Sequence, residues 1–452
     1  MRICIISGSP KGKNSITFQT VRYIAKNFPD CEFATLHVGQ KIRSYERDMT
    51  AALETIGKAD LLLFCYPVYT FLVPSQLHRF IELMKESGID LSGKCAAQIS
   101  TSKHFYDTTA HNFIRENCAD MGLRYLGGLS ADMDDLTKAK GQKEAIDFWN
   151  LVLWREKNGY SDITMPCAHV EIPPYTRVFA NIPKTEGREI VIVANMEESD
   201  GNLAAMIEDF RARCPYAARV VNVMDYPFSG GCLGCFGCAA DGKCIYKDGF
   251  DEFLRNEIQT ADAIVYAFTV KDHSMGARMK MFDDRQFCNG HRTVTIGMPV
   301  GYLVNGDLAN EPNLRTVIEG RADVGQNFLA GVATNADGIA ELADTLVYAL
   351  DEKIVLPQMF LGVGGMKIFR DLIWVMQGMM KADHEFYKEH GMYDFPQKEI
   401  GRILMMKGVG AMISNPKIKA KMGNKMTEGM LMPYEKVLKK SEKRKEKSEE
   451  KR

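Results

Sequence analysis

The residues best suited to chemistry are four cysteines within thirteen positions near the middle of the chain. Cys232, Cys235, Cys238 and Cys244 have the spacing C-x2-C-x2-C-x5-C, and a glycine precedes each of the first three. Glycine permits the tight turns and the close backbone approach that N–H to sulfur hydrogen bonds require. Thiols spaced in this way indicate metal binding or redox chemistry.

Three interpretations of this cysteine loop (residues 231–244) stay open. The C-x2-C-x2-C run is the spacing of ferredoxin loops, in which a further cysteine completes the ligands of an iron–sulfur cubane. Structural zinc sites more often join two C-x2-C pairs across a longer gap. A redox dithiol or an empty loop is the third possibility. The spacing favours a [4Fe–4S] cluster.

The composition of the 452-residue chain is that of a soluble globular protein. Hydrophobic residues make up 46% and charged residues 25%, and the formal net charge is −1, so the charge does not favour a nucleic-acid partner. The start, MRICIISGSP, predicts a strand rather than a signal peptide, and no apolar stretch is long enough for a membrane span. Eight further cysteines are scattered singly, which favours a reducing, cytoplasmic location.

Apolar runs alternate with amphipathic stretches in the first third of the chain. The strand-like runs are RICIIS, EFATLHV, ADLLLFCYP, CAAQIST and LRYLGGL, and helical patterns such as SITFQTVRYIAKNF lie between them. Apolar strands separated by helices predict a doubly wound α/β fold, with a five-stranded parallel sheet covered on both faces.

The same pattern then starts again in the second half. REIVIVAN matches RICIISG with a shift of 187 residues, whereas ADAIVYAFTV matches ADLLLFCYPV with a shift of 202. The second copy therefore has about fifteen extra residues between its first and third strands, and the cysteine loop lies in that interval. Open parallel sheets bind ligands at the carboxyl ends of their strands, where such an insertion would lie.

These patterns predict five segments. Residues 1–156 form the first domain, 157–187 a proline-rich linker, and 188–354 a second domain of the same fold with the cysteine loop inserted. Residues 355–435 form a helical extension rich in methionine, and 436–452 a charged tail.

The first strand runs into SGSPKGKNSIT, and a helix follows. A Gly- and Ser-rich turn at this point presents backbone N–H groups at the positive end of the helix, which suits a phosphate. Ser9, Ser15 and Thr17 add hydroxyl groups, and Lys11 adds a positive charge. The alternative is a turn whose glycine and serine serve only its tightness.

Two motifs together resemble a known family. GSPKGKNSIT, followed by YPVYTFLVPSQLHRFIEL, is similar to the pattern GSPR-x-x-S-x-T and P-x-Y-x-x-x-x-P-x-x-L-K of the flavodoxin-like NAD(P)H-dependent FMN reductases. The resemblance implies that the first loop holds the FMN phosphate, that the second lies along the flavin ring, and that a third closes over it. The residues it assigns to FMN are Ser9, Lys11, Asn14, Ser15, Ile16, Thr17, Pro67, Val68, Tyr69, Thr70, Phe71, Thr101, Ser102 and Lys103.

This sequence departs from the family pattern at two positions. Lys11 stands where arginine is usual and therefore lacks the bidentate fork of a guanidinium group, and His78 replaces the usual lysine. His104, beside the third loop, is a weak candidate for a proton or hydrogen-bond donor to flavin or substrate. A surface histidine is the competing interpretation.

The cysteine loop, which precedes KDGFDEF, resembles that of the iron–sulfur flavoproteins, in which a [4Fe–4S] cluster lies close to FMN. Here the two features are divided between the copies. The first turn of the second copy carries Glu197, Glu198 and Asp200, which would repel a phosphate. We therefore expect FMN in the first domain and the cluster in the second, brought together in an intramolecular pseudo-dimer, with a homodimer also possible.

The combined prediction is an oxidoreductase that passes electrons between a donor, FMN and a [4Fe–4S] cluster. The family resemblance implies NAD(P)H as a possible co-substrate, with a small molecule or a protein as the other partner. A non-catalytic electron carrier or redox sensor is the alternative, in which the cysteine loop holds zinc or no metal.

Overall fold

The computed structural model describes residues 1–162, 172–417, 431–432, 434–435, 437–441 and 443. Part of the predicted linker (163–171) and most of the predicted tail lie outside the described residues. The chain divides into two compact units, Met1–His390 and Gly391–Arg452. The first unit contains both predicted sheets.

The first sheet has five parallel strands in the order β2-β1-β3-β4-β5. The side chains of β3 and β4 are buried along almost their whole length, as the long apolar runs predict for strands covered on both faces. The strands are β1 (Arg2–Ser7), β2 (Glu32–Leu36), β3 (Leu61–Pro67), β4 (Cys95–Ser102) and β5 (Arg124–Asp132).

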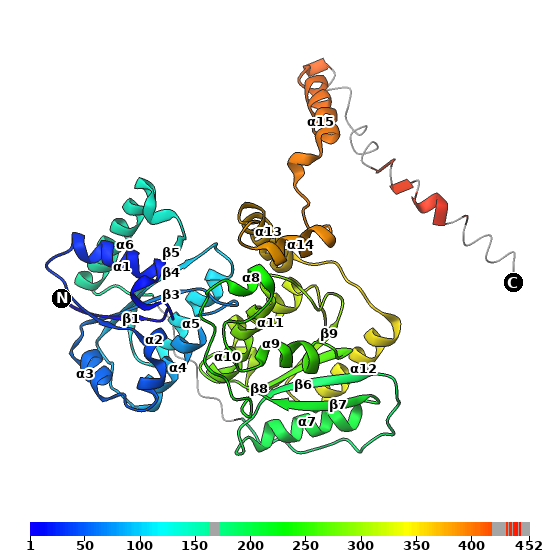
Figure 1. Cartoon of the computed structure of the whole chain (residues 1–452), viewed down its shortest axis with the longest axis horizontal. Helices are drawn as coiled ribbons and strands as arrows, with labels where there is room; N and C mark the ends of the chain where they lie inside the picture. Colours follow the sequence, from blue (N-terminus) through cyan, green and yellow to red (C-terminus); the bar gives the residue numbers. More distant parts are fainter. Residues whose placement is uncertain (163–171, 418–430, 433, 436, 442, 444–452) are drawn as a thin grey trace. The chain divides into compact units, whose positions relative to one another are not determined.

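The second sheet repeats this arrangement. Its order, β10-β9-β8-β6-β7, is that of the first sheet counted from β6, and all its pairs are parallel. Both sheets therefore have the flavodoxin-like strand order, and the predicted fold class is confirmed (Figure 1). The strands are β6 (Glu189–Asn195), β7 (Ala217–Asn222), β8 (Ala263–Thr269), β9 (Pro299–Asn305) and β10 (Phe328–Ala333).

Helices connect the strands in both domains. Those of domain one are α1 (Ile16–Asn27), α2 (Val38–Tyr45), α3 (Thr50–Lys58), α4 (Ser75–Glu86), α5 (Asp107–Asp120) and α6 (Ala139–Asn158). Those of domain two are α7 (Gly201–Arg213), α8 (Gly237–Asp241), α9 (Phe250–Phe253), α10 (Gly276–Arg285), α11 (Pro312–Val324) and α12 (Ala336–Glu352). Short 3-10 or π turns occur at Gly12–Asn14, Asp135–Thr137, Leu254–Ile258, Gln286–Asn289, Leu308–Asn310 and Pro396–Lys398.

The extra residues of domain two lie where the sequence offset predicts them. The connection from β7 to β8 runs over 223–262, whereas the equivalent connection from β2 to β3 runs over 37–60. The longer connection contains the whole cysteine loop and α8. It follows the carboxyl end of a strand, the edge at which such sheets bind ligands.

The two domains pack through equivalent helices. Helix α4 contacts α10, and α5 contacts α11, so each helix meets its counterpart, as in an isologous dimer interface. The interface is polar as well as apolar. Glu82 accepts a hydrogen bond from the Ala277 amide (2.7 Å), and Lys85 pairs with Asp272 (2.9 Å).

The C-terminal segment is divided between the two units. Helices α13 (Phe360–Val375) and α14 (Lys381–Glu389) belong to the first unit, where α13 packs on α11 and α14 on α8. Helix α15 (Ile400–Ile413) belongs to the second. Among the described residues, no helix is long and apolar enough to cross a membrane.

Candidate functional site

One cavity of about 410 Å³ brings the predicted residues together. Its volume lies within the range of cofactor and small-molecule sites. All four cysteines of the loop line it, together with every residue that the resemblance assigns to FMN except Phe71. We call it the first cavity. Its lining includes Ser9, Lys11, Asn14, Ser15, Ile16, Thr17, Pro67, Val68, Tyr69, Thr70, Thr101, Ser102, Lys103, Cys232, Cys235, Cys238 and Cys244.

The turn after β1 leaves polar groups available at one end of the first cavity. Ser15 occupies the N-cap position of α1, but its side chain makes no capping hydrogen bond. The first N–H groups of a helix have no partner within the helix and favour an anion. The hydroxyl of Thr17 is buried without a hydrogen-bond partner in the described structure. These groups fit a phosphate.

The loop after β3 forms a second wall. Tyr69 bonds to Leu72 through both backbone groups (2.8 and 3.0 Å), and Thr70 and Phe71 have positive φ angles of 41° and 72°. Tyr69 lines the first cavity, and burial raises the pKa of its hydroxyl well above the usual value. Phe71 turns away and packs on Tyr106, with ring centroids 4.2 Å apart.

The loop after β4 forms the third wall. Thr101, Ser102 and Lys103 line the first cavity, and the Thr101 hydroxyl is buried without a partner among the described residues. His104 is not part of this lining. Its imidazole is half-exposed and lies 2.9 Å from Asp107, which fits the surface interpretation.

The cysteine loop touches the flavin-type loops directly. Gln76 of domain one donates to the carbonyl of Cys232 (3.2 Å), and the Lys11 ammonium lies 5.6 Å from the ring centroid of Phe236. Gly234 has a φ of +59°, and a methyl group at this position would lie 1.9 Å from the Tyr69 hydroxyl. Glycine is therefore required at this contact for two independent reasons.

The sulfur atoms of the cysteine loop lie in surroundings that affect their protonation. The Gly234 amide donates to the Cys232 sulfur (3.4 Å), a contact of the kind that stabilises metal-bound thiolates. Burial raises the pKa of Cys238 to about 11, so a bound metal would have to stabilise its thiolate form.

Zinc ligands at 2.3 Å would bring their sulfur atoms about 3.8 Å apart. Among the described residues, only His78, Glu82 and Asp272 form a trio of potential metal ligands within 4.8 Å of one another, and no three of these sulfurs do. Arg79 (2.7 Å) and Lys85 (2.9 Å) already pair with the two carboxylates of that trio. The cysteines are thus spaced more widely than a tetrahedral zinc site requires.

Several residues of the first cavity were not predicted from the sequence. Arg285 at the end of α10 pairs with Asp248 (2.7 Å) and donates to the carbonyl of Gly230 (2.9 Å), so it braces the start of the cysteine loop. Cys288 is a fifth thiol in the lining, and burial raises its pKa to about 12. Cys288 belongs to no cysteine motif, so the sequence did not predict its place in the lining.

Helices α13 and α14 add a further wall. Phe369 and Leu372 of α13 line the first cavity. His291 also lines it, and its Nδ1 lies 2.9 Å from Asp383 of α14, which in turn pairs with Arg292 (2.7 Å). Helices α13 and α14 are therefore part of the site, although they lie outside both sequence resemblances.

The corresponding edge of domain two is built differently. Glu197 and Glu198 are exposed, and the Asp200 carboxylate accepts a hydrogen bond from Thr269 (3.0 Å). Thr269 ends β8, at the position that Pro67 holds at the end of β3. The carboxylates at this turn disfavour a phosphate.

Comparisons with known proteins concern domain one in particular. The sequence profile of the NADPH-dependent FMN reductase family matches residues 1–128, a range that includes all three predicted flavin loops. The iron–sulfur flavoprotein of Archaeoglobus fulgidus is 29% identical over 173 residues, which cover 35% of this chain and 78% of that protein. These similarities support a flavin-dependent NAD(P)H oxidoreductase.

Two solved structures are similar to part of this chain. An NADH:FMN oxidoreductase in its apo form is 19% identical, covers 34% of this chain and 89% of its own, and has a TM-score of 0.30. General stress protein 14 of Treponema denticola, solved in complex with FMN, is 13% identical, covers 34% of this chain and 98% of its own, and has a TM-score of 0.29.

Proposed function

We propose that the protein is an FMN-dependent NAD(P)H oxidoreductase, with FMN in domain one and a [4Fe–4S] cluster on the cysteine loop of domain two. The observation that carries the proposal is the first cavity, where both sets of predicted residues line one space. FMN exchanges electrons singly or in pairs and a [4Fe–4S] cluster exchanges one at a time, so the two groups would connect two-electron with one-electron partners.

Domain one would bind FMN through three loops. The N-terminus of α1, with Ser9, Ser15 and Thr17, would hold the phosphate, and Lys11 would add charge. Pro67–Thr70 and Thr101–Lys103 would flank the ring. The unpartnered hydroxyls of Thr17 and Thr101 support this assignment, because a buried hydroxyl without a partner is costly unless a ligand satisfies it.

Domain two would hold the cluster through Cys232, Cys235, Cys238 and Cys244. The wide spacing of the sulfurs and the Gly234 N–H to sulfur contact support a cluster rather than tetrahedral zinc. The matching strand orders and the paired helices support descent of the two domains from one duplicated unit, acting as an intramolecular pseudo-dimer.

The donor would be NAD(P)H, docked directly on the flavin face, because the sequence contains no G-x-G-x-x-G fingerprint that would indicate a separate dinucleotide site. The acceptor would be a small molecule or a protein. Eleven described cysteines are free, which favours a reducing compartment such as the cytoplasm.

Anaerobic purification followed by absorption spectroscopy, FMN extraction and metal analysis tests the proposal. We expect stoichiometric FMN, broad iron–sulfur absorbance and about four iron atoms per chain. The double variant Ser9→Ala/Ser15→Ala should lose FMN and keep iron, whereas Cys235→Ser should lose iron and keep FMN. Full FMN occupancy in the serine variant would remove the flavin from domain one, and zinc without iron would reject the cluster.

A non-catalytic electron carrier or redox sensor, with zinc or no metal on the cysteine loop, is the second candidate. Steady-state oxidation of NADPH and of NADH with a simple acceptor distinguishes the two. Multiple turnovers per chain indicate an enzyme, and reduction that stops at one equivalent of bound cofactor indicates a carrier.

A further inference from the structure

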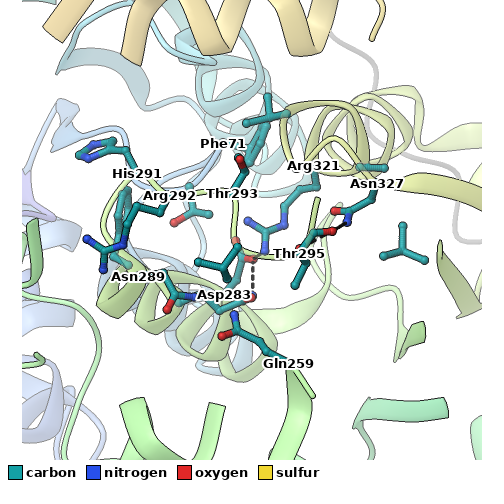
Figure 2. A pocket seen from close by; sticks show the side chains of 18 of the residues that line it. Phe71, Gln259, Asp283, Asn289, His291, Arg292, Thr293, Thr295, Arg321 and Asn327 are labelled. Atoms are coloured by element: carbon teal, nitrogen blue, oxygen red, sulfur yellow. Dashed lines mark hydrogen bonds and ion pairs between the residues drawn. The ribbon is translucent and has the colours of Figure 1, made fainter. Parts of the chain in front are cut away.

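A second cavity, of about 150 Å³ (Figure 2), shares part of its lining with the first. Thr70, Phe71 and Phe105 of domain one line part of it. On the side of domain two, the connection from α10 to β9 contributes more lining residues than any other segment, and β8, β9, α10 and α11 add further ones. The two cavities share the lining residues Thr70, Phe105, Phe287, Gly290, His291 and Phe369. Any occupant would therefore lie next to the loop proposed to run along the flavin ring.

The size and the aromatic walls of the second cavity suit one planar ring. A cavity of about 150 Å³ has room for a molecule of the size of benzene. Phe71, Tyr266 and Tyr302 line this one, and the rings of the two tyrosines lie 5.2 Å apart at an interplanar angle of 31°. Larger polycyclic compounds would exceed this volume.

Two buried polar atoms in the lining have no hydrogen-bond partner in the described structure. Asp283 is buried, and its Oδ1 binds Arg321 (2.6 Å) and accepts from Gln286 (3.4 Å), but its Oδ2 is unpartnered. The Oγ1 of Thr293 is likewise buried and unpartnered. Leaving such groups unsatisfied costs about 1–3 kcal/mol each, which a ligand with a matching polar group would relieve.

The charges of the lining favour a neutral ligand. Figure 2 shows Arg321 directed at Asp283, which neutralises it, and Arg292 is paired with Asp383 (2.7 Å). Because both guanidinium groups are already paired with carboxylates, neither is left to neutralise a ligand carboxylate. A hydroxyl group can donate to the Oδ2 of Asp283 and also accept from the Thr293 hydroxyl.

We propose that the second cavity is a substrate subsite for a neutral one-ring aromatic compound that carries a hydroxyl group. The hydroxyl donates to Asp283 Oδ2 and accepts from Thr293 Oγ1, while the ring lies against Phe71, Tyr266 and Tyr302. The role as a substrate subsite rests on the proposed function, since it depends on flavin in the first cavity. Binding of the ring compound to the second cavity does not depend on the proposed function.

The chain builds this cavity with residues that domain one lacks. The connection from α10 to β9 runs over 286–298, whereas the equivalent connection from α4 to β4 runs over 87–94. The longer connection supplies Phe287, His291 and Thr293 to the lining. The second cavity thus depends on a connection that is longer in domain two than its counterpart in domain one.

Binding of phenol, benzoate and toluene to the full-length protein, measured by calorimetry with and without FMN, tests the inference. We expect saturable 1:1 binding of phenol and at least tenfold weaker binding of benzoate and of toluene. Equal affinity for phenol and toluene would overturn the hydrogen-bonding assignment. Absence of phenol binding would overturn the subsite. This series uses the unmodified protein and needs no variant to fold.

Variants then localise the site. Thr293→Val should weaken phenol binding about tenfold, which corresponds to about 1.4 kcal/mol, and should leave toluene binding and FMN content unchanged. Thr293→Ser should retain phenol affinity within about twofold. Thr316→Val on α11, which lines neither cavity, is the matched control and should change nothing. Unchanged phenol affinity in Thr293→Val would place the ligand elsewhere.

The two proposals fail separately. A protein that binds phenol but holds no FMN would retain the ring site and lose the proposed function. A protein that holds FMN and oxidises NADPH without binding phenol would retain the function and lose the second cavity as its substrate subsite.

Discussion

The two domains share a strand order but differ at the edge where such sheets bind ligands. In domain one the N-cap residue Ser15 leaves its helix uncapped, and the hydroxyl of Thr17 has no partner in the described structure. In domain two the equivalent turn is acidic, and Asp200 accepts a hydrogen bond from Thr269. Among the described residues, the edge of the first sheet thus has polar groups without partners that a ligand could bind, whereas polar groups at the edge of the second sheet bond to each other.

The difference shows that two domains of the same fold contribute chemically different groups to the lining of a single cavity. Domain one contributes hydroxyls, helix N–H groups and a lysine, and domain two contributes thiols from an insertion. Because α4 packs on α10 and α5 on α11, the contributions meet across an interface between equivalent surfaces. The following predictions test this comparison, beginning with the largest expected effect.

Converting the turn of domain one toward that of domain two should abolish FMN binding. In Ser15→Asp a carboxylate would lie close to the proposed phosphate, at a cost of about 4 kcal/mol for unit charges 4 Å apart in a surrounding of intermediate dielectric. We expect FMN content below a tenth of the wild-type value, measured by extraction and fluorescence. Glu198→Ser in the matching turn is the control and should leave it unchanged. Normal FMN in Ser15→Asp would contradict the comparison.

The domain interface contains two buried histidines with opposite pKa shifts. Burial lowers the pKa of His78 to about 4. Burial also acts to lower the pKa of His273, but hydrogen bonds to Asp120 (2.9 Å) and Glu311 (2.9 Å) outweigh it and raise the pKa to about 10. An unfolded histidine titrates near 6.5.

His273 should therefore stabilise the fold fully below pH 6.5, and its contribution should fall as the pH rises toward 10. His78 is more easily protonated when unfolded, so stability should fall as the pH drops from 6.5 toward 4. Urea unfolding between pH 4.5 and 9.5 should show a maximum near pH 6.5. His273→Gln should cost about 3 kcal/mol at pH 6.5 and flatten the alkaline slope, whereas His78→Gln should flatten the acid slope. A variant curve parallel to wild type would refute the assignment.

Gly234 tests the contact between the cysteine loop and the flavin-type loop. Gly234→Ala places a methyl group on the Tyr69 hydroxyl and requires a positive φ, so we expect a loss of about 2 kcal/mol and reduced iron content. Gly237→Ala is the matched control, because its methyl group would meet only the Cys235 sulfur, at 3.9 Å. Tyr69→Phe should partly restore iron in Gly234→Ala. Equal iron in both alanine variants would argue against the contact.

Lys11 gives the smallest expected effect. Lys11→Ala should weaken FMN binding by about tenfold, through loss of a charged hydrogen bond worth about 1.5 kcal/mol. Lys11→Arg should bind FMN at least as tightly as wild type, because the guanidinium group offers a bidentate fork. Phe236→Ala would show how much the ring 5.6 Å from the Lys11 ammonium contributes. Titration of apoprotein with FMN measures all three.

Much of the fold followed from local patterns in the sequence. The apolar runs predicted the strands, and the shift from 187 to 202 between the copies placed the insertion between the first and third strands of domain two. The structure shows the longer connection between β7 and β8. The Gly- and Ser-rich turn after β1 was recognisable from its residue types, whereas the roles of the loops after β3 and β4 came from the family resemblance. The convergence of those loops with the cysteines was a hypothesis about packing, and the first cavity has that geometry.

Residues that contribute through long-range packing gave no such signal. Cys288, His291 and Phe369 belong to no sequence motif. Their place in the lining depends on the connection after α10 and on the packing of α13 against α11. Phe71 shows the converse. Its neighbours in the motif line the first cavity, but its positive φ turns the ring toward Tyr106 and the second cavity. No spacing rule predicts which member of a loop turns away.

The joining of both domains in one chain has a consequence for concentration. Where two separate subunits form a shared site, the fraction of complete sites depends on the protein concentration, because dilution dissociates the subunits. Here both halves of the cavity wall lie within Met1–His390. The proportion of complete sites should therefore stay constant on dilution to nanomolar levels, and each chain carries one such site rather than half of two.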